Sequence, residues 1–144
     1  MSYKETGLSR VYRTRSLSSE RNKLLKIMVY AIFEVQEENI GSERYKDLSA
    51  FIALTSKAII SSIETTIMAW EKRGYWVKAD HFREKWNWIF LYQKSLVEII
   101  QSEQWNSLTS LNNSIMSSIN DVKTSRTQSI GEPWSGSYKK LKNK

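Results

Sequence analysis

The chain has 144 residues and a formal charge of +7 at pH 7, with 40% hydrophobic and 12% aromatic residues. This length suits one domain, and this apolar content excludes wholesale disorder. The lack of cysteine excludes disulfides and cysteine-ligated zinc, and the single histidine, His81, excludes a multi-histidine metal site. One proline and five glycines are too few for the turns of a sandwich or barrel, so the composition predicts a few long helices.

The first two predicted helices cover residues 20–39 and 43–73. Ser18, Ser19 and Glu20 favour a helix start, because hydroxyls and acids stabilise the positive end of a helix. Gly41 and Ser42 pair a helix-ending glycine with a helix-starting serine, which predicts an antiparallel return. The second helix meets no glycine or proline before Gly74. The apolar seams of these two helices are Leu24, Met28, Ala31, Ile32 and Val35, then Tyr45, Leu48, Ile52, Ile59, Ile63, Thr66 and Trp70.

Two further helices are predicted over residues 77–102 and 105–122, separated by a weak break that contains no glycine. In the third helix, residues 86–92 are apolar nearly all round, which predicts burial at the bundle centre or contact with a partner. The inner faces of these helices are predicted to be Phe82, Trp86, Ile89, Leu96 and Ile100, then Trp105, Leu108, Leu111, Ile115, Ile119 and Val122.

Short links between four helices predict an all-α, antiparallel up-down four-helix bundle in residues 20–122. Residues 1–19 and 123–144 are predicted to be basic, extended tails, the second with two aromatic anchors, Trp134 and Tyr138. The Ser/Thr/Arg-rich start also has the composition of an organellar transit segment. No apolar run reaches the ~18 residues of a membrane-spanning helix. The expected location is therefore the cytoplasm, or the stroma of a plastid.

Positive charge is concentrated at the two ends of the chain. Residues 1–26 hold seven cations and two acids, and residues 123–144 hold six cations and one acid. The segment between them holds nine cations and twelve acids, so the body is slightly acidic. Basic ends attract phosphate-rich partners, nucleic acid or anionic lipid, although solvated tails that only aid solubility have the same composition.

No catalytic motif is present in the sequence. His81 lies beside Asp80 and three positions before Glu84, but a histidine among charged residues near the start of an amphipathic helix is more often a solvated surface residue. Glu64 and Glu71 share a helix face, which is an ordinary arrangement of exposed acids. Glycine-rich phosphate loops, nucleophile elbows and calcium loops are absent from the sequence. We therefore expect a non-enzymatic protein without a cofactor.

Residues 70–86 interleave cations with aromatic rings. This mixture is typical of surfaces that bind single-stranded nucleic acid, where cations contact phosphates and rings stack on bases. A helical corner packed with its own aromatic residues is the commoner explanation. The candidate partner-binding residues, taken from this corner, the tails and the 86–92 turn, are Arg10, Arg13, Arg15, Lys72, Arg73, Tyr75, Trp76, Lys78, Arg83, Lys85, Trp88, Trp134, Tyr138, Lys139 and Lys140.

The pattern of residues 69–86, with Trp105 and the Pro133-Trp134 pair downstream, resembles helical proteins of cyanobacteria and plastids over residues 20–138. This resemblance implies a helical fold and carries no activity with it.

The function predicted from the sequence is that of a helical-bundle adaptor that binds an acidic partner. RNA or a ribonucleoprotein is the favoured partner, and an acidic protein surface comes second. The alternative is a structural or assembly factor, with self-association through the Trp88 face left open. An anionic membrane surface is the least favoured partner.

Overall fold

The computed structural model describes the backbone of residues 5–119 and 133–143 and, within these ranges, the side chains from Leu17 onward. Every regular element in this part of the chain is a helix, which confirms the all-α prediction. The elements are α1 (Glu5–Val35), α2 (Glu43–Lys72), α3 (Trp76–Lys85), α4 (Asn87–Ser102), α5 (Asn106–Ser114), α6 (Met116–Ile119) and α7 (Ser137–Lys142).

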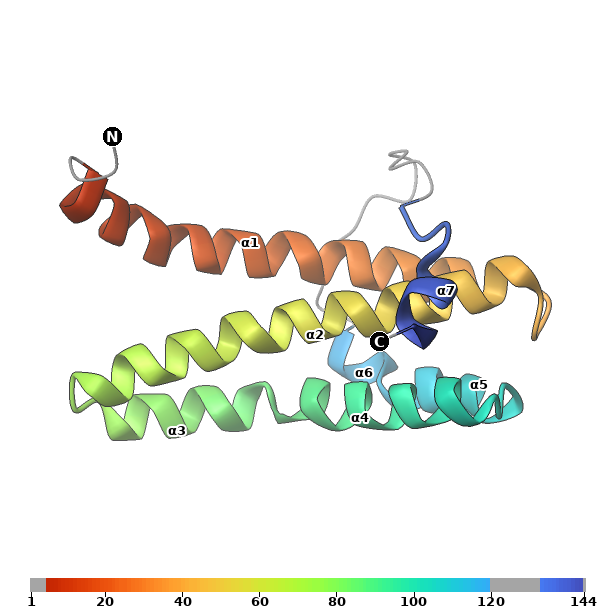
Figure 1. Ribbon diagram of the computed structural model, residues 1–144. Coiled ribbons are helices and arrows are strands. Elements are labelled where there is room, and N and C mark those ends of the chain that lie inside the picture. Colours follow the sequence, from red (N-terminus) through yellow and green to blue (C-terminus); the bar gives the residue numbers. More distant parts are fainter. Residues whose placement is uncertain (1–4, 120–132, 144) are drawn as a thin grey trace.

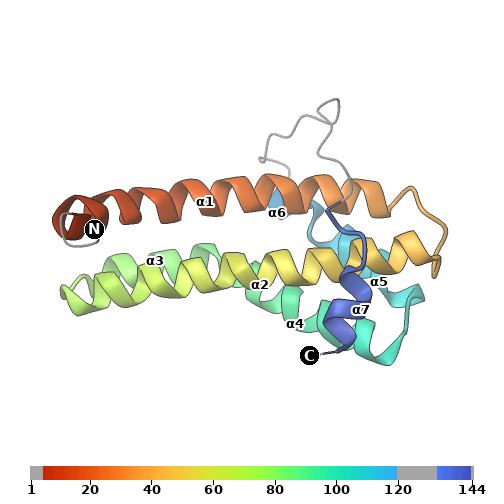
Figure 2. The same ribbon diagram turned by 45° about the horizontal axis from the view of Figure 1, so that its top comes forward.

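Helix α2 is the central element of the molecule. It contacts α1, α3, α4 and α7, and α4 in turn contacts α5. Figure 1 shows α1 on one side of α2 and the α3–α4 pair on the other, so the molecule is elongated along these helices. Turned by 45°, the same view shows α7 crossing α2 near the α1–α2 turn (Figure 2).

Helix α1 begins much earlier than the sequence pattern predicts. Because residues 5–19 are helical, the prediction of an extended N-terminal tail is wrong for this segment. No glycine or proline lies between Leu8 and Ile40, and serine is only mildly unfavourable inside a helix, so Ser18 and Ser19 do not stop it. The helix ends at Val35, before the predicted end near Asn39.

The two predicted glycine turns are present. Gly41 has φ +83° and Gly74 has φ +82°, a region that favours glycine, and each lies between two antiparallel helices. The Ser42 hydroxyl accepts a hydrogen bond from the backbone N–H of Tyr45 at 3.2 Å, as predicted for the first residue before α2. Gly74 follows Lys72 and Arg73, so α2 ends where the sequence indicates.

The third and fourth predicted helices are each divided. Trp86, with φ −102° and ψ 6°, separates α3 from α4, and its N–H still bonds to the carbonyl of Phe82 at 3.1 Å. The chain therefore keeps its direction through this break (Figure 1). Ile115 divides α5 from α6 in the same manner, and residues 120–122 lie outside the described residues. Between α4 and α5, Glu103 adopts a left-handed conformation without the help of glycine.

The core follows the predicted seams closely in the middle of the molecule and thins toward the Gly74 turn. Buried side chains come from α1, α2, α4, α5, α6 and α7, whereas α3 buries only Ala79 among its ten residues. Tyr92, which is not among the residues of the predicted inner face, is buried, and Leu24, Thr66 and Trp70 are only half-buried. The fully covered seam residues include Met28, Ala31, Ile32, Leu48, Ile59, Ile63, Ile89, Leu96, Ile100 and Leu108.

The C-terminal segment is not an extended tail where it is described. Residues 137–142 form α7, and the Trp134 side chain is 2% exposed. Its ring stacks on Tyr30 at a centroid distance of 6.4 Å and meets the edge of Phe51 at 6.1 Å. The prediction is wrong for this segment because one large aromatic ring can bury enough apolar surface to dock a short segment. Residues 123–132 lie outside the described residues.

Among the described helices, α2 alone is long and apolar enough to cross a membrane by length and composition. The same properties are expected of a core helix. Because α2 carries twelve buried residues and contacts four other helices, its apolar surface is explained by the fold.

Candidate functional site: a basic and aromatic hairpin end

The α2–α3 hairpin brings the predicted aromatic-basic corner to one end of the molecule (Figure 1). We call residues 68–86, from the last turns of α2 to Trp86, the hairpin end. Three of its rings form an internal cluster of edge-to-face contacts: Trp70 meets Phe82 at 4.9 Å, and Phe82 meets Trp86 at 6.3 Å. Tyr75 and Trp76, in contrast, are more than half exposed. The site therefore offers two rings to a partner, and the other three hold the hairpin together.

Some cations of the hairpin end are likewise engaged in contacts within the chain, and others are not. Arg83 donates to Glu71 and to Asp80, each at 2.6 Å, and the hydrogen bond to Glu71 is the main reason why the pKa of Arg83 is raised. Lys78 lies 4.6 Å from the ring centre of Trp70, and Lys85 lies 5.9 Å from that of Trp86. These contacts fix charge at the surface without neutralising the lysines.

Lys72 and Arg73 are exposed at the end of α2. Among the described side chains, no ion pair involves Lys72, Arg73 or Lys78. These three charges surround the exposed Tyr75 and Trp76 in the chain. A partner with negative charge would thus meet uncompensated cations next to two accessible rings.

A buried arginine joins α1 to this hairpin. Arg21 donates to the hydroxyls of Ser62 at 2.8 Å and Thr66 at 3.4 Å, and its guanidinium lies 5.1 Å from the ring centre of Phe82. Burial lowers its pKa, because a charged group loses solvation in the interior. This contact aligns the N-terminal half of α1 with the end of α2.

The N-terminal half of α1 contains Arg10, Arg13 and Arg15, whose side chains lie outside the described residues. Both ribbon views place this half of α1 at the same end of the molecule as the Gly74 turn (Figures 1 and 2). The antiparallel α1–α2 pair thus brings the basic start of the chain to the same end of the molecule as the hairpin end, although the two are some sixty residues apart in the sequence.

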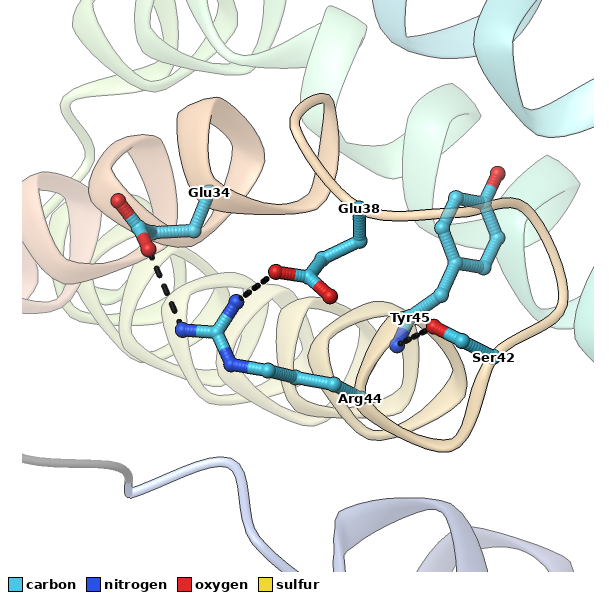
Figure 3. Close-up of polar contacts among 5 residues, drawn as sticks. All are labelled: Glu34, Glu38, Ser42, Arg44 and Tyr45. Carbon is cyan, nitrogen blue, oxygen red and sulfur yellow. Dashed lines mark hydrogen bonds and ion pairs between the residues drawn. The ribbon is translucent and has the colours of Figure 1, made fainter.

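At the opposite end of the molecule, two acids of the α1–α2 turn are paired with one arginine. Arg44 bonds to both Glu34, at 3.2 Å, and Glu38, so that it links α2 to the end of α1 (Figure 3). A cleft of about 480 Å³ beside this turn is lined by Glu38, Tyr45, Asn112 and neighbouring residues, with no cation among them. The cleft itself therefore has little attraction for an acidic partner.

The remaining candidate residues are scattered. Trp88 is half-buried and stacks on Trp86 at 6.2 Å, and Trp134 is buried by its own chain. Tyr138 packs against Trp105 at 5.8 Å. Lys139 and Lys140 are exposed on α7, which docks near the start of α2. From Asp47, which contacts α7, to Lys72 the helix rises by roughly 38 Å, so these lysines are not part of the hairpin end.

The acid-base candidates of the sequence lie on α2 and α3. His81 is exposed on α3, and its neighbour Asp80 is engaged by Arg83. Glu71 is engaged by the same arginine, and Glu64 is exposed. Among the described residues, no group of three or more potential ligand side chains could hold a metal ion.

Sequence reasoning missed two features of the site. One is the exposure of Met68 and Val77, and the other is the buried hydrogen bond of Arg21 to Ser62. Met68 and Val77 lie off the predicted seams, so helical periodicity contained the signal for their exposure. Arg21 gave no such signal, because a basic residue on a helix is ordinarily solvated.

No family model, no curated protein and no solved structure matches this chain. The resemblance to helical proteins of cyanobacteria and plastids stays a prediction. The class that fold and site define is therefore an all-helical protein with a basic, aromatic end.

Proposed function

We propose that this protein is a non-enzymatic helical adaptor that engages an acidic partner, RNA or a ribonucleoprotein, through the hairpin end. The observation that carries the proposal is the placement of Lys72, Arg73 and Lys78 around the exposed rings of Tyr75 and Trp76. The basic start of α1 lies at the same end, and α7 supplies a second basic contact. The cytoplasm or a plastid stroma is the expected location.

This arrangement suits single-stranded RNA better than duplex. Cations bind the phosphates and release counterions, while exposed rings stack on bases that are not paired. Two rings are accessible, so at most two bases are stacked at once.

We also propose that α1, α2, the α3–α4 pair and the α5–α6 pair correspond to the four arms of an antiparallel up-down bundle, with α2 as its central arm.

Salt-dependent binding of single-stranded RNA tests the proposal. In a plot of the logarithm of affinity against that of salt concentration, the double variant Lys72→Ala, Arg73→Ala should lose about 1.4 of the slope, because each single-strand phosphate contact contributes about 0.7. Trp76→Ala should weaken binding by about 1–3 kcal/mol, the contribution of one stacked base, with little change of slope.

The matched control is Lys57→Ala, which removes an exposed cation from the middle of α2. It should leave both affinity and slope unchanged. Binding by the double variant with the wild-type slope would reject the hairpin end as the RNA contact. Loss of RNA binding on His81→Ala would instead point to a specific role for that histidine.

The second candidate function is that of a structural or assembly factor acting through protein contacts. It is favoured by Leu91, which is more than half exposed on α4 next to the half-buried Trp88. Exposed apolar side chains of this size are enriched where chains associate. Self-association in sedimentation that is abolished by Leu91→Asp would favour this function over the adaptor.

A further inference from the structure

Exposed apolar surface is concentrated at the tip of the hairpin. Among the described residues, six large hydrophobic side chains are more than half exposed, and four of them belong to this tip: Met68 at 67%, Tyr75 at 51%, Trp76 at 60% and Val77 at 69%. They come from the last turns of α2, the Gly74 turn and the first turn of α3. RNA would use the two rings, but it leaves Met68 and Val77 without a role.

Cations lie directly beside this apolar surface. Lys72 and Arg73 stand between Met68 and Tyr75 in the chain, and Lys78 follows Val77. The nearest acid in the sequence, Glu71, is held by Arg83 at 2.6 Å and does not compensate these three charges. The basic N-terminal half of α1 lies at the same end (Figures 1 and 2).

Tryptophan and tyrosine prefer the boundary between lipid headgroups and acyl chains, and valine and methionine prefer the acyl chains themselves. Lysine and arginine beside them bind anionic headgroups. We infer that the hairpin tip, residues 68–78, docks on an anionic membrane surface, with Met68, Trp76 and Val77 inserted and Lys72, Arg73 and Lys78 at the headgroup phosphates.

This membrane contact goes beyond the proposed binding of RNA and does not depend on it. The protein would lie on the bilayer rather than cross it, because the apolar side chains of α2 outside the tip are committed to the core. Each cation near an anionic surface strengthens binding roughly fivefold. Each inserted apolar side chain adds on the order of tenfold, since burial removes its surface from water.

Cosedimentation with lipid vesicles tests the inference. The full chain should bind phosphatidylcholine vesicles that contain phosphatidylserine and should bind pure phosphatidylcholine vesicles weakly or not at all. Val77→Asn and Met68→Asn should each lower the partition coefficient about tenfold, and the double variant Lys72→Gln, Arg73→Gln should lower it by more than tenfold. Vesicles with brominated acyl chains should quench wild-type tryptophan fluorescence more than that of Trp76→Phe.

Leu91→Asn is the matched control, because Leu91 is 59% exposed but lies on α4, away from the tip. It should bind vesicles as the wild type does. All these side chains are exposed, so the variants should keep the wild-type circular dichroism spectrum. Failure of the full chain to bind anionic vesicles at low salt, or wild-type binding by Val77→Asn, would overturn the inference.

The same variants separate the lipid from RNA. Val77→Asn and Met68→Asn should leave RNA affinity unchanged, since neither side chain can stack on a base or contact a phosphate. If instead both variants weaken RNA binding and vesicles are not bound, the apolar tip serves a nucleic-acid interface and the membrane inference is wrong. If RNA is not bound at all, the vesicle experiment still decides the inference on its own.

Discussion

At the scale of single residues, polar groups inside the core decide how the short helices attach to the long ones. The hydroxyl of Tyr92 on α4 donates to Asn112 Oδ1 on α5 at 2.8 Å, and both side chains are buried. Burial raises the pKa of Tyr92, because the charged phenolate would lose its solvation. This hydrogen bond connects α5 to a helix that is itself packed on α2.

Replacement of Tyr92 by phenylalanine should destabilise the protein at neutral pH. The change leaves Asn112 Oδ1 buried without its donor, which costs about 1–3 kcal/mol. Denaturant unfolding followed by circular dichroism measures this difference. Tyr75→Phe, which alters a tyrosine that is more than half exposed, should be neutral in the same experiment.

Tyr92 should also make the protein sensitive to alkali. Its folded-state pKa lies above the unfolded value near 10, so its contribution is fully present below pH about 10 and is lost as pH rises toward the folded-state pKa. The free energy of unfolding of Tyr92→Phe should therefore fall less steeply above pH about 10 than that of the wild type. Part of the decline should persist, because burial also raises the pKa of Tyr45.

At the scale of helices, periodicity and glycine predicted the middle of the fold. Gly41 and Gly74 end helices because they can take positive φ, and the seams of α2 and α4 face the core as their spacing indicates. The breaks at Trp86 and Ile115 carry no such residue. They adjust the direction of a helix against its neighbours, which is a tertiary effect and leaves no signal in the local sequence.

The site was also predicted only in part, because tertiary contacts leave no signal in the local sequence. The sequence of residues 70–86 shows the cations and rings of the site. It does not show which of them form contacts within the chain and which stay exposed to a partner. Phe82 is used in packing because it contacts Trp70 on α2, and Trp86 because it contacts Trp88 on α4. Arg83 is used because Glu71 lies across the hairpin. These pairings depend on how α3 lies against α2. Trp134 is a further example, since its burial depends on the rings of Tyr30 on α1 and Phe51 on α2.

One carboxylate of α2 contributes two hydrogen bonds to the docking of α7. Asp47 accepts hydrogen bonds from the backbone N–H groups of Gly136 at 3.1 Å and Tyr138 at 3.0 Å. Asp47→Ala should cost about 1 kcal/mol, as the loss of a capping side chain does, and should expose Trp134. A red shift and stronger acrylamide quenching of tryptophan fluorescence would report this exposure.

The control for this prediction is Glu64→Ala, which removes an exposed acid from the same helix far from α7. It should leave the fluorescence unchanged. If Asp47→Ala also keeps the wild-type emission and quenching, the burial of Trp134 between Tyr30 and Phe51 is sufficient to hold the segment.

At the scale of the whole molecule, the basic groups lie at two separate places. The hairpin end and the exposed lysines of α7 are roughly 38 Å apart along α2. This separation exceeds the Debye length of about 8 Å at physiological salt, so the two groups do not act as one cluster. A partner that engages both must therefore be long, and a short one engages a single group.

The length of the RNA should thus decide whether α7 contributes to binding. With one phosphate per roughly 3.4 Å of stacked strand, about eleven nucleotides are needed to span the distance. The double variant Lys139→Ala, Lys140→Ala should bind a six-nucleotide strand like the wild type, but should lose about 1.4 of the salt slope with a twenty-nucleotide strand. The hairpin variant Lys72→Ala, Arg73→Ala should lose slope with both strands. Equal losses of slope for the α7 variant with both strands would show that one RNA does not bridge the two basic groups. The adaptor would then bind RNA by a path that does not follow α2.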